Sequence, residues 1–216
     1  MVNRGKVFFT SDPHFGHGNI LKYCRRTKFM TPEEIRKLDA GEDFRVSRES
    51  IDKMSTHLID QINTTVGEDD TLWCLGDWSF PSNYEEAMKY RFRIHCKDVN
   101  LVLGNHDKRG IAKAFSICGD LIELSVDHLK IVLCHYAMAI FNGSHRSALH
   151  LYGHSHSGAE ETMDKAFPDR RSMDAGVDNA FKLLGEYRPF SIDEIKKRLL
   201  PKKGAVIDHH GAKKKR

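Results

Sequence analysis

Five short segments of this sequence carry side chains that can bind a metal ion or move a proton, and each directly follows an apolar run. They are Ser11-Asp12-Pro13-His14, Gly76-Asp77, Gly104-Asn105-His106-Asp107, Cys134-His135 and Gly153-His154-Ser155-His156. Donors of the Asp, Asn and His types suit borderline to hard divalent ions such as Mn, Fe, Zn, Ni or Co, whereas Mg and Ca prefer oxygen ligands alone. The chemistry indicated is therefore that of a divalent transition metal.

The number of donors indicates a pair of ions. Eight donors are too many for one ion that must also hold water and substrate, but they suit two ions about 3.5–4 Å apart that share a carboxylate. In Asp12-Pro13-His14 and His154-Ser155-His156, residues two apart in extended backbone face the same side, so one short segment can present two donors. Gly76, Gly104 and Gly153 lack a Cβ and would let the backbone turn sharply beside the ions.

Each segment taken alone has an ordinary structural explanation. Gly76-Asp77 and residues 104–107 have the composition of tight turns, and Asp12-Pro13-His14 that of a loop. A single histidine such as His135 is more often a buried, hydrogen-bonded side chain than a ligand. The joint occurrence of all five segments, each at the end of a strand-like run, favours a metal site over five unrelated turns.

The elements that must position these donors are short strands alternating with helices. The expected strands are continuously apolar, as strands buried on both faces are, and span residues 7–9, 71–75, 99–103, 129–134 and 149–152. Helices are expected over 48–66, over 82–93 with Ser82 as a cap, and from a Ser191–Glu194 capping box to residue 200. This order predicts a layered α/β fold with partly parallel sheets, in which the carboxyl ends of the strands converge on one site.

Composition limits the class of protein. The chain has 216 residues, 40% hydrophobic and 30% charged, and no apolar run long enough to span a membrane. Its five cysteines are odd in number and scattered, so we expect no disulfide framework and a reducing, cytoplasmic location without membrane attachment. The net charge of +4 permits a polyanionic partner without requiring one, and nothing indicates an obligatory protein partner.

We expect one domain over residues 1–202. Residues 25–47 are charged and delay the crossover from the first strand to the helix at 48–66, so we interpret them as a helical insertion near the rim of the site. Residues 203–216 lack apolar periodicity and end in Lys213-Lys214-Lys215-Arg216, which predicts a disordered basic tail.

The constellation D-x-H, G-D, G-N-H-D, H and G-H-x-H, found here in the order given above, resembles the calcineurin-like metallophosphoesterase superfamily. The resemblance spans about two thirds of the chain. It implies a four-layer α/β/β/α sandwich with mixed sheets and a binuclear centre. Carried over residue by residue, it assigns Asp12, His14 and His156 to one ion, Asn105, His135 and His154 to the other, and Asp77 to both.

Further motifs resemble the small bacterial and phage members. They are residues 10–20 together with Gly176-Val177-Asp178 and Tyr187-Arg188-Pro189. One departure matters: many members read G-D-x-x-D, whose last carboxylate orients the histidine of G-N-H, but this chain has Phe80 at that position. We take Asp107 as the candidate partner of His106 instead.

The implied reaction is attack on a phosphate ester by a hydroxide that bridges two ions. His106, next to Asn105 in the strand-end turn, is the candidate leaving-group acid or transition-state stabiliser. His17, Asn19 and Arg146 are weaker candidates for contact with substrate; a helix cap for Asn19 and a solvated loop for Arg146 are the structural alternatives.

We therefore expect a phosphoesterase that prefers phosphodiesters, with nucleic acid or a nucleotide as candidate substrate. The first alternative is a phosphomonoesterase acting on nucleotides, which would differ only in the shape of its pocket. The second is a non-catalytic, metal-stabilised module that binds nucleic acid through the basic tail and the insertion. Such a module would have lost some of its metal ligands, but the ligands carried over and His106 are all present here.

Overall fold

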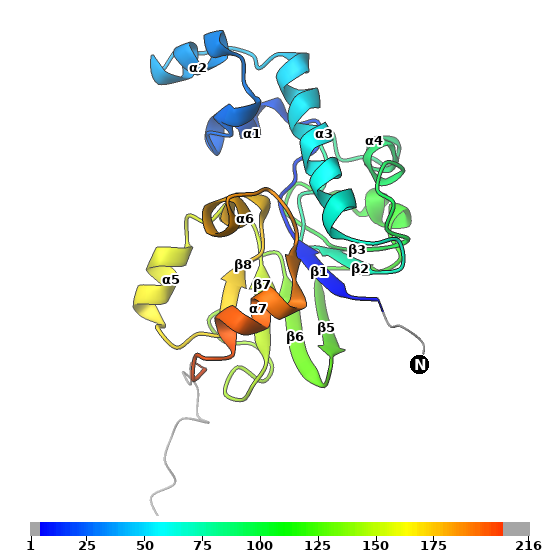
Figure 1. Ribbon diagram of the computed structural model, residues 1–216, viewed down its shortest axis with the longest axis vertical. Coiled ribbons are helices and arrows are strands. Elements are labelled where there is room, and N and C mark those ends of the chain that lie inside the picture. The colour runs from blue at the N-terminus through cyan, green and yellow to red at the C-terminus, as the bar shows by residue number, and fades with distance from the viewer. Residues whose placement is uncertain (1–4, 205–216) are drawn as a thin grey trace, which may run out of the picture.

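The structure is a computed structural model that describes residues 5–204 (Figure 1). Its first sheet has the strand order β4-β3-β2-β1-β9. The strands are β1 (Val7–Thr10), β2 (Thr71–Cys74), β3 (Asp98–Val102), β4 (Cys118–Gly119) and β9 (Phe190–Ser191). β1 to β4 run parallel and β9 is antiparallel to β1, so the sheet is mixed.

The second sheet has the order β5-β6-β7-β8 and is also mixed. Its strands are β5 (Leu121–Val126), β6 (Leu129–Cys134), β7 (Leu149–Tyr152) and β8 (Ser172–Asp174). β6, β7 and β8 run parallel, whereas β5 is the antiparallel partner of β6 in a hairpin. Both sheets therefore contribute several parallel carboxyl ends.

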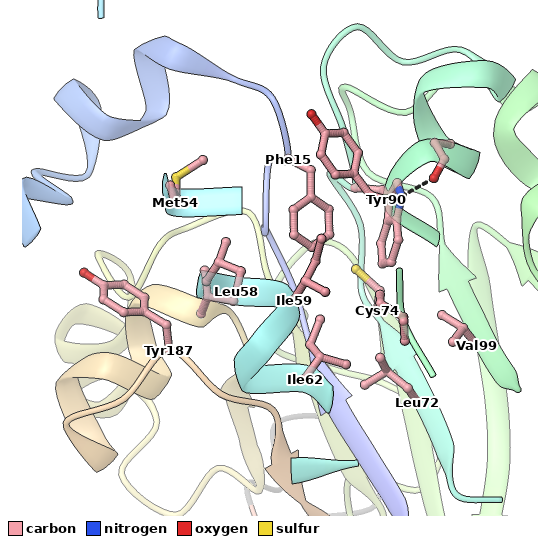
Figure 2. Packing of buried hydrophobic residues seen from close by; sticks show 14 of the residues in the cluster. Phe15, Met54, Leu58, Ile59, Ile62, Leu72, Cys74, Tyr90, Val99 and Tyr187 are labelled. Carbon is pink, nitrogen blue, oxygen red and sulfur yellow. Dashed lines mark hydrogen bonds between the residues drawn. The ribbon is translucent and has the colours of Figure 1, made fainter. Parts of the chain in front are cut away.

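Alternation along the strands divides the apolar side chains into two cores. Leu72 and Val99 point from the first sheet toward the helices, where Leu58 and Ile62 of the long helix α3 (Arg48–Thr65) meet them (Figure 2). Phe8 of β1 belongs to the same core. The other side chains of β1 and β2 meet those of β6, β7 and β8 in a core between the two sheets. That second core includes Phe9, Trp73, Leu133, Leu151 and Met173. Strands packed on both faces explain why the sequence shows continuous apolar runs.

Helices cover both sides of the paired sheets. They are α1 (Gly18–Tyr23), α2 (Pro32–Asp39), α3 (Arg48–Thr65), α4 (Tyr84–Arg91), α5 (Glu160–Ala166), α6 (Val177–Leu184) and α7 (Ile192–Leu199), with 3₁₀ turns η1 (Thr27–Phe29) and η2 (Arg109–Ala114). α3 and α4 lie over the first sheet, and α5 lies on the side of the second sheet, where Glu160 meets the hydroxyl of Tyr152. The predicted four-layer α/β/β/α sandwich with mixed sheets is confirmed.

The predicted strands and helices agree with the observed ones to within about two residues at each end, apart from the four strands and several helices that the sequence did not indicate. One cap was wrong. The N-cap of α4 is Asn83, whose side chain accepts from the Glu86 amide, while Ser82 accepts from the amide of Lys108. The Ser191–Glu194 capping box is present as expected.

Residues 25–47 contain η1 and α2, and α2 begins with a capping box between Thr31 and Glu34. In Figure 1, α1 and α2 stand with the start of α3 at one end of the molecule, beyond the sheets. All but residues 203 and 204 of the predicted basic tail lie outside the described residues. Among the described helices, we find none with both the length and the apolar character that a membrane crossing requires.

Candidate metal centre

The strand-end segments meet at one end of the sandwich, and their backbone is held in an unusual conformation there. Positive φ angles occur at Asp12 (57°), His14 (49°), Asp77 (55°), His154 (65°) and His156 (48°). Residues other than glycine rarely adopt this left-handed region, and such strain persists only where surrounding contacts enforce it. Its concentration at predicted ligands indicates a functional site rather than ordinary turns.

Two glycines allow the donors to pack closely. A Cβ at Gly104 would overlap the carboxylate and the backbone amide of Asp77, and one at Gly153 would overlap the side chains of Ser11 and Asp12. The absence of a side chain therefore lets the loops after β3 and β7 lie directly against the carboxylates that follow β2 and β1.

A first donor group consists of Asp12, His14 and His156, each offering an atom within 4.8 Å of the others. The Asp12 Oδ1 atom lies 3.9 Å from His14 Nε2 and 4.0 Å from His156 Nε2. His14 Nε2 is buried and has no hydrogen-bond partner among the described residues. A buried nitrogen that faces two carboxylates without a hydrogen bond fits a metal ligand.

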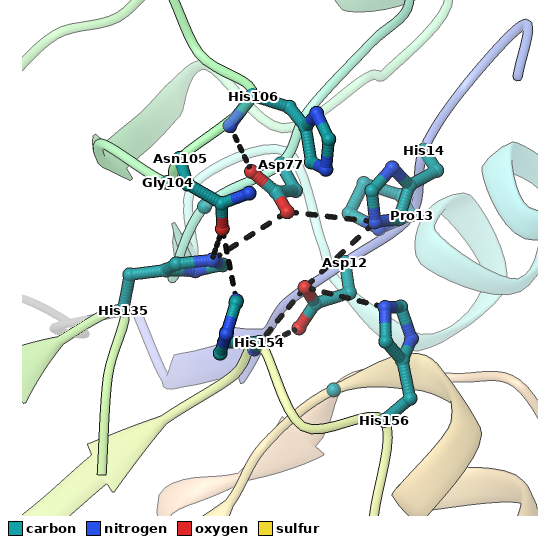
Figure 3. A network of polar contacts seen from close by, with 12 residues as sticks. Asp12, Pro13, His14, Asp77, Gly104, Asn105, His106, His135, His154 and His156 are labelled. Carbon is teal, nitrogen blue, oxygen red and sulfur yellow. Dashed lines mark hydrogen bonds and ion pairs between the residues drawn. The ribbon is translucent and has the colours of Figure 1, made fainter. Parts of the chain in front are cut away.

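A second donor group consists of Asn105, His135 and His154. The Asn105 Oδ1 atom lies 3.0 Å from His135 Nε2 and 2.9 Å from His154 Nδ1. Asp77 lies between the two groups, with its Oδ2 atom 3.5 Å from both His14 Nε2 and His135 Nε2 (Figure 3). The geometry thus matches two clusters of donors joined by one carboxylate.

The electrostatics of the site favour a bound cation. Burial raises the pKa of Asp12 to about 7, although the nearby imidazoles of His156 and His135 lower it. Burial lowers the pKa of His14 to about 2. For His135 and His156, burial lowers the pKa most strongly, but the contacts with Asp77 and Asp178 and the charge of Asp12 together exceed this effect and raise the values to about 9 and about 10. Positive charge on His135 and His156 is therefore stabilised by the neighbouring carboxylates, whereas burial keeps His14 neutral, the form that binds a metal.

A charged chain behind the first donor group holds His156 in place. The Nδ1 atom of His156 lies 2.7 Å from Asp178 Oδ2. Asp178 accepts two hydrogen bonds from the fully buried guanidinium of Arg26, at 2.9 and 2.8 Å. The same guanidinium donates to the backbone oxygens of Asp12 and Pro13. A carboxylate behind a ligating histidine fixes its ring orientation and its tautomer, and here Arg26 connects that carboxylate to the loop after β1.

His106 lies at the mouth of the site. Its backbone amide donates to Asp77 Oδ1 at 2.9 Å, its ring centroid is 5.6 Å from that of His14, and the residue is exposed. In Figure 3 it stands above Asp77. The candidate partner Asp107 proved wrong: its carboxylate accepts from the backbone amides of Asp77, Trp78 and Gly104, so it shapes the turn and is not directed at the His106 ring.

The three candidates for substrate contact lie in different places. His17 is at the site, with its Nδ1 atom 3.4 Å from His14 Nδ1, and Asn19 is exposed at the start of α1. Arg146 lies away from the metal site. It precedes β7, and its backbone oxygen accepts from Arg171, whereas the donors follow the opposite, carboxyl end of that strand.

Sequence reasoning did not place Arg26, Asp174 or Asp178 at the metal site. Asp174 ends β8, and its Oδ2 atom accepts from the Ser155 hydroxyl and the Ser157 amide, which fixes the loop that carries His154 and His156. The usable signal was Gly176-Val177-Asp178, which the sequence showed only as a motif of the resemblance. Its place after a strand was missed because β8 has only three residues. Nothing in the sequence marks Arg26, which lies 152 residues from Asp178.

Comparisons with known proteins give a family match and a similar fold. A sequence model described as the calcineurin-like phosphoesterase superfamily domain matches residues 54–169, which include Asp77, His106 and His135. An uncharacterised protein of Methanocaldococcus jannaschii is 26% identical over 202 residues, covering 94% of each chain. The crystal structure of a protein of unknown function from Aquifex aeolicus has a TM-score of 0.63 at 21% identity, covering 89% of this chain and 98% of that one, and shows a similar fold.

Proposed function

Because the chain belongs to the calcineurin-like phosphoesterase superfamily and is thereby a metal-dependent hydrolase of phosphate esters, we propose that it acts through two metal ions and prefers phosphodiesters. The observation that supports a binuclear centre best is the position of Asp77, whose Oδ2 atom is equidistant from a histidine of each donor group. A carboxylate in that position can serve two cations at once.

In this proposal Asp12, His14 and His156 hold one ion, Asn105, His135 and His154 hold the other, and Asp77 contacts both. The residues fit the ions because the unpartnered His14 nitrogen and the closely spaced carboxylates gain from positive charge between them. Bound Mn, Fe, Zn, Ni or Co ions would lower the pKa of a water molecule and neutralise phosphate oxygens.

The remaining chemistry falls to side chains at the mouth of the site. His106 is fixed through its backbone amide to Asp77 while its ring stays exposed, so it can donate a proton to the leaving oxygen of an ester. His17 lies beside it, with ring centroids 6.3 Å apart. The two imidazoles form one wall, which suits them to bind the phosphate oxygens turned away from the donor groups.

The preference for diesters is supported by the space on both sides of the centre. A cavity of about 690 Å³ lies beyond His17, and one of about 430 Å³ lies beside His135 and Tyr136. A phosphodiester carries two ester groups and a monoester only one, so room on two sides favours the diester.

We also retain the proposals of a single domain over residues 1–202 and of a reducing, cytoplasmic setting. The second is supported by the cysteines, since all five lie in the described part of the chain as free thiols.

The test is hydrolysis by metal-stripped protein resupplied with Mn, Ni, Zn or Mg. We expect turnover of bis(p-nitrophenyl) phosphate to exceed that of p-nitrophenyl phosphate and to require a transition metal. His106→Ala should lower kcat by about 100-fold or more while both ions stay bound, because a positioned proton donor contributes that much.

His95→Ala is the matched control, because His95 is exposed and precedes β3, at the end of that strand away from the donors. Full activity in His106→Ala would remove that residue from the mechanism. A failure of either substrate to turn over with any metal, despite two bound ions, would contradict the proposed activity.

A further inference from the structure

The cavity of about 690 Å³ beside the metal centre has walls of mixed chemical character. It is bounded by residues 16–19, by the start of α3 at Arg48, and by the segment that joins Phe80 and Pro81. Its volume lies within the range of about 300–1,000 Å³ that small-molecule sites occupy. Ligand groups of the size of a nucleotide therefore fit it.

His17 connects the cavity to the metal centre. On one side its Nδ1 atom lies 3.4 Å from that of His14, and on the other its ring stacks on Phe80, with centroids 4.6 Å apart and planes 25° from parallel. His17 and Phe80 both line the cavity. An ester group that leaves the centre on this side passes His17 and meets Phe80 directly.

Phe80 is a large apolar residue in the wall of the cavity, and 47% of its surface is exposed. An exposed ring beside a phosphate-binding centre offers a surface on which a nucleobase can stack, and every base has such a face. A carboxylate at the same place would repel a second phosphate.

The opposite wall of the cavity is basic. Arg45 is exposed and makes no ion pair within residues 5–204, and Arg48 pairs with Asp52 at 3.0 Å, where both side chains are more than half exposed. Lys89 pairs with Glu86, the carboxylate in this wall, at 3.4 Å. An exposed pair such as Arg48–Asp52 is weak, so Arg48 can turn to a phosphate at little cost.

We propose that this cavity binds one nucleotide unit of the substrate, with its base against Phe80 and its phosphate at Arg45 and Arg48. The inference rests on the proposed function, because the neighbouring phosphodiester would then lie at the donor groups. It assigns the substrate as an unpaired nucleotide chain or a nucleotide ester, since a base can stack on Phe80 only when it is free of a duplex.

Oligonucleotide binding can be measured directly and independently of hydrolysis. Fluorescein-labelled hexathymidylate with phosphorothioate linkages is titrated with the Mn-loaded full chain, and fluorescence anisotropy gives the dissociation constant. We expect Phe80→Ala and Arg45→Ala each to weaken binding about 10-fold, because base stacking and a phosphate contact each contribute at that scale. Binding should also weaken as salt increases.

Two substitutions serve as matched controls. Phe92→Ala removes an even more exposed ring, at the end of α4, and Arg198→Ala removes an exposed arginine on α7. Both should bind the oligonucleotide as the unchanged protein does. Equal losses in the controls, or no loss in Phe80→Ala and Arg45→Ala, would overturn the inference.

Competition distinguishes the source of the nucleotide. Thymidine 5′-monophosphate that displaces the labelled chain at a concentration similar to that of unlabelled hexathymidylate identifies a nucleotide ester as ligand. Displacement by the longer chain alone identifies single-stranded nucleic acid.

The two proposals can fail separately. Oligonucleotide binding that depends on Phe80, without hydrolysis of any phosphate ester, would contradict only the proposed function. Hydrolysis of bis(p-nitrophenyl) phosphate without oligonucleotide binding would contradict only this inference.

Discussion

The two donor groups differ in how the protein supports them. In the first, the side chains of Asp12 and His14 are 0% and 4% exposed, and His156 is held by Asp178 and Arg26. In the second, His135 is buried, but Asn105 and His154 are exposed and contact each other. The first group is held rigidly before an ion arrives, and the second can adjust.

The difference follows from where the ligands are anchored. Residues 12–14 are tied to neighbouring segments through Arg26, through backbone bonds to residues 76 and 77, and through the His154 amide, which donates to Asp12. Ligands that are already in place lose little conformational entropy on binding. We therefore expect two metal affinities, with the tighter ion at the first group.

The substitution with the largest expected effect is Asp77→Asn, because Asp77 serves both groups. Removal of its charge should reduce the bound metal from two ions to one or none. Hydrolysis should fall beyond the roughly 10–100-fold typical for residues that only support a ligand. Equilibrium dialysis against Mn together with kinetics measures both effects.

Asp60→Asn is the control, since Asp60 is an exposed carboxylate on α3. Retention of two tightly bound ions by Asp77→Asn would show that the groups are independent, and the shared carboxylate would have to be abandoned.

Substitutions that affect only one donor group test whether the two groups differ in metal affinity. Asp178→Asn should weaken the tighter ion by about 10–100-fold and leave the weaker one unchanged, whereas Asn105→Ala should do the reverse. Isothermal titration with Mn resolves the two steps. If both substitutions weaken the same step, the assignment of tight and weak sites is wrong.

Arg26 should also matter for stability. Arg26→Ala leaves Asp178 without its cation in a buried position, which costs about 3–5 kcal/mol of the free energy of unfolding. Arg26→Lys keeps the charge but not the two-pronged geometry, so we expect it to regain part of the stability and less of the metal affinity. Urea denaturation with and without Mn separates these effects.

The last expected effect is a pH dependence of the free energy of unfolding in metal-free protein. The pKa values of His156 and His135 are raised to about 10 and about 9, so the folded state binds protons that the unfolded state releases above about pH 6.5. The stabilisation is complete below about pH 6.5 and is lost as the pH rises toward these values, by up to about 1.4 kcal/mol per pH unit for each group.

Saturating Mn should flatten this dependence, because the ions replace the protons as the source of positive charge. Urea denaturation at several pH values between 6.5 and 9, with EDTA or with Mn, measures it. Asp178→Asn should remove only the contribution of His156 to the pH dependence, which would assign that contribution to the first donor group. The same slope with and without metal would show that these histidines are not ligands.

Much of the site could be predicted because its ligands follow continuously apolar strands. Asp12, Asp77 and His135 each come within three residues after such a strand, and the carboxyl ends of parallel strands meet at one edge. Arg146 was not a good candidate because it lies before its strand, at the end opposite the donors. The residues that support the ligands were harder to predict. Asp107 and Asp174 accept hydrogen bonds from backbone amides, and the segments that contain them have the same composition as an ordinary turn.

The sequence by itself determined which residues can bind metal, the strand ends that carry them, and the α/β layers, because hydrophobic periodicity and donor chemistry are local properties. Tertiary structure alone decided that Arg26 and Asp178 meet behind His156, that Phe80 stacks on His17, and that one donor group is buried and the other exposed. These features depend on contacts between segments far apart in the chain, whose packing no local pattern encodes.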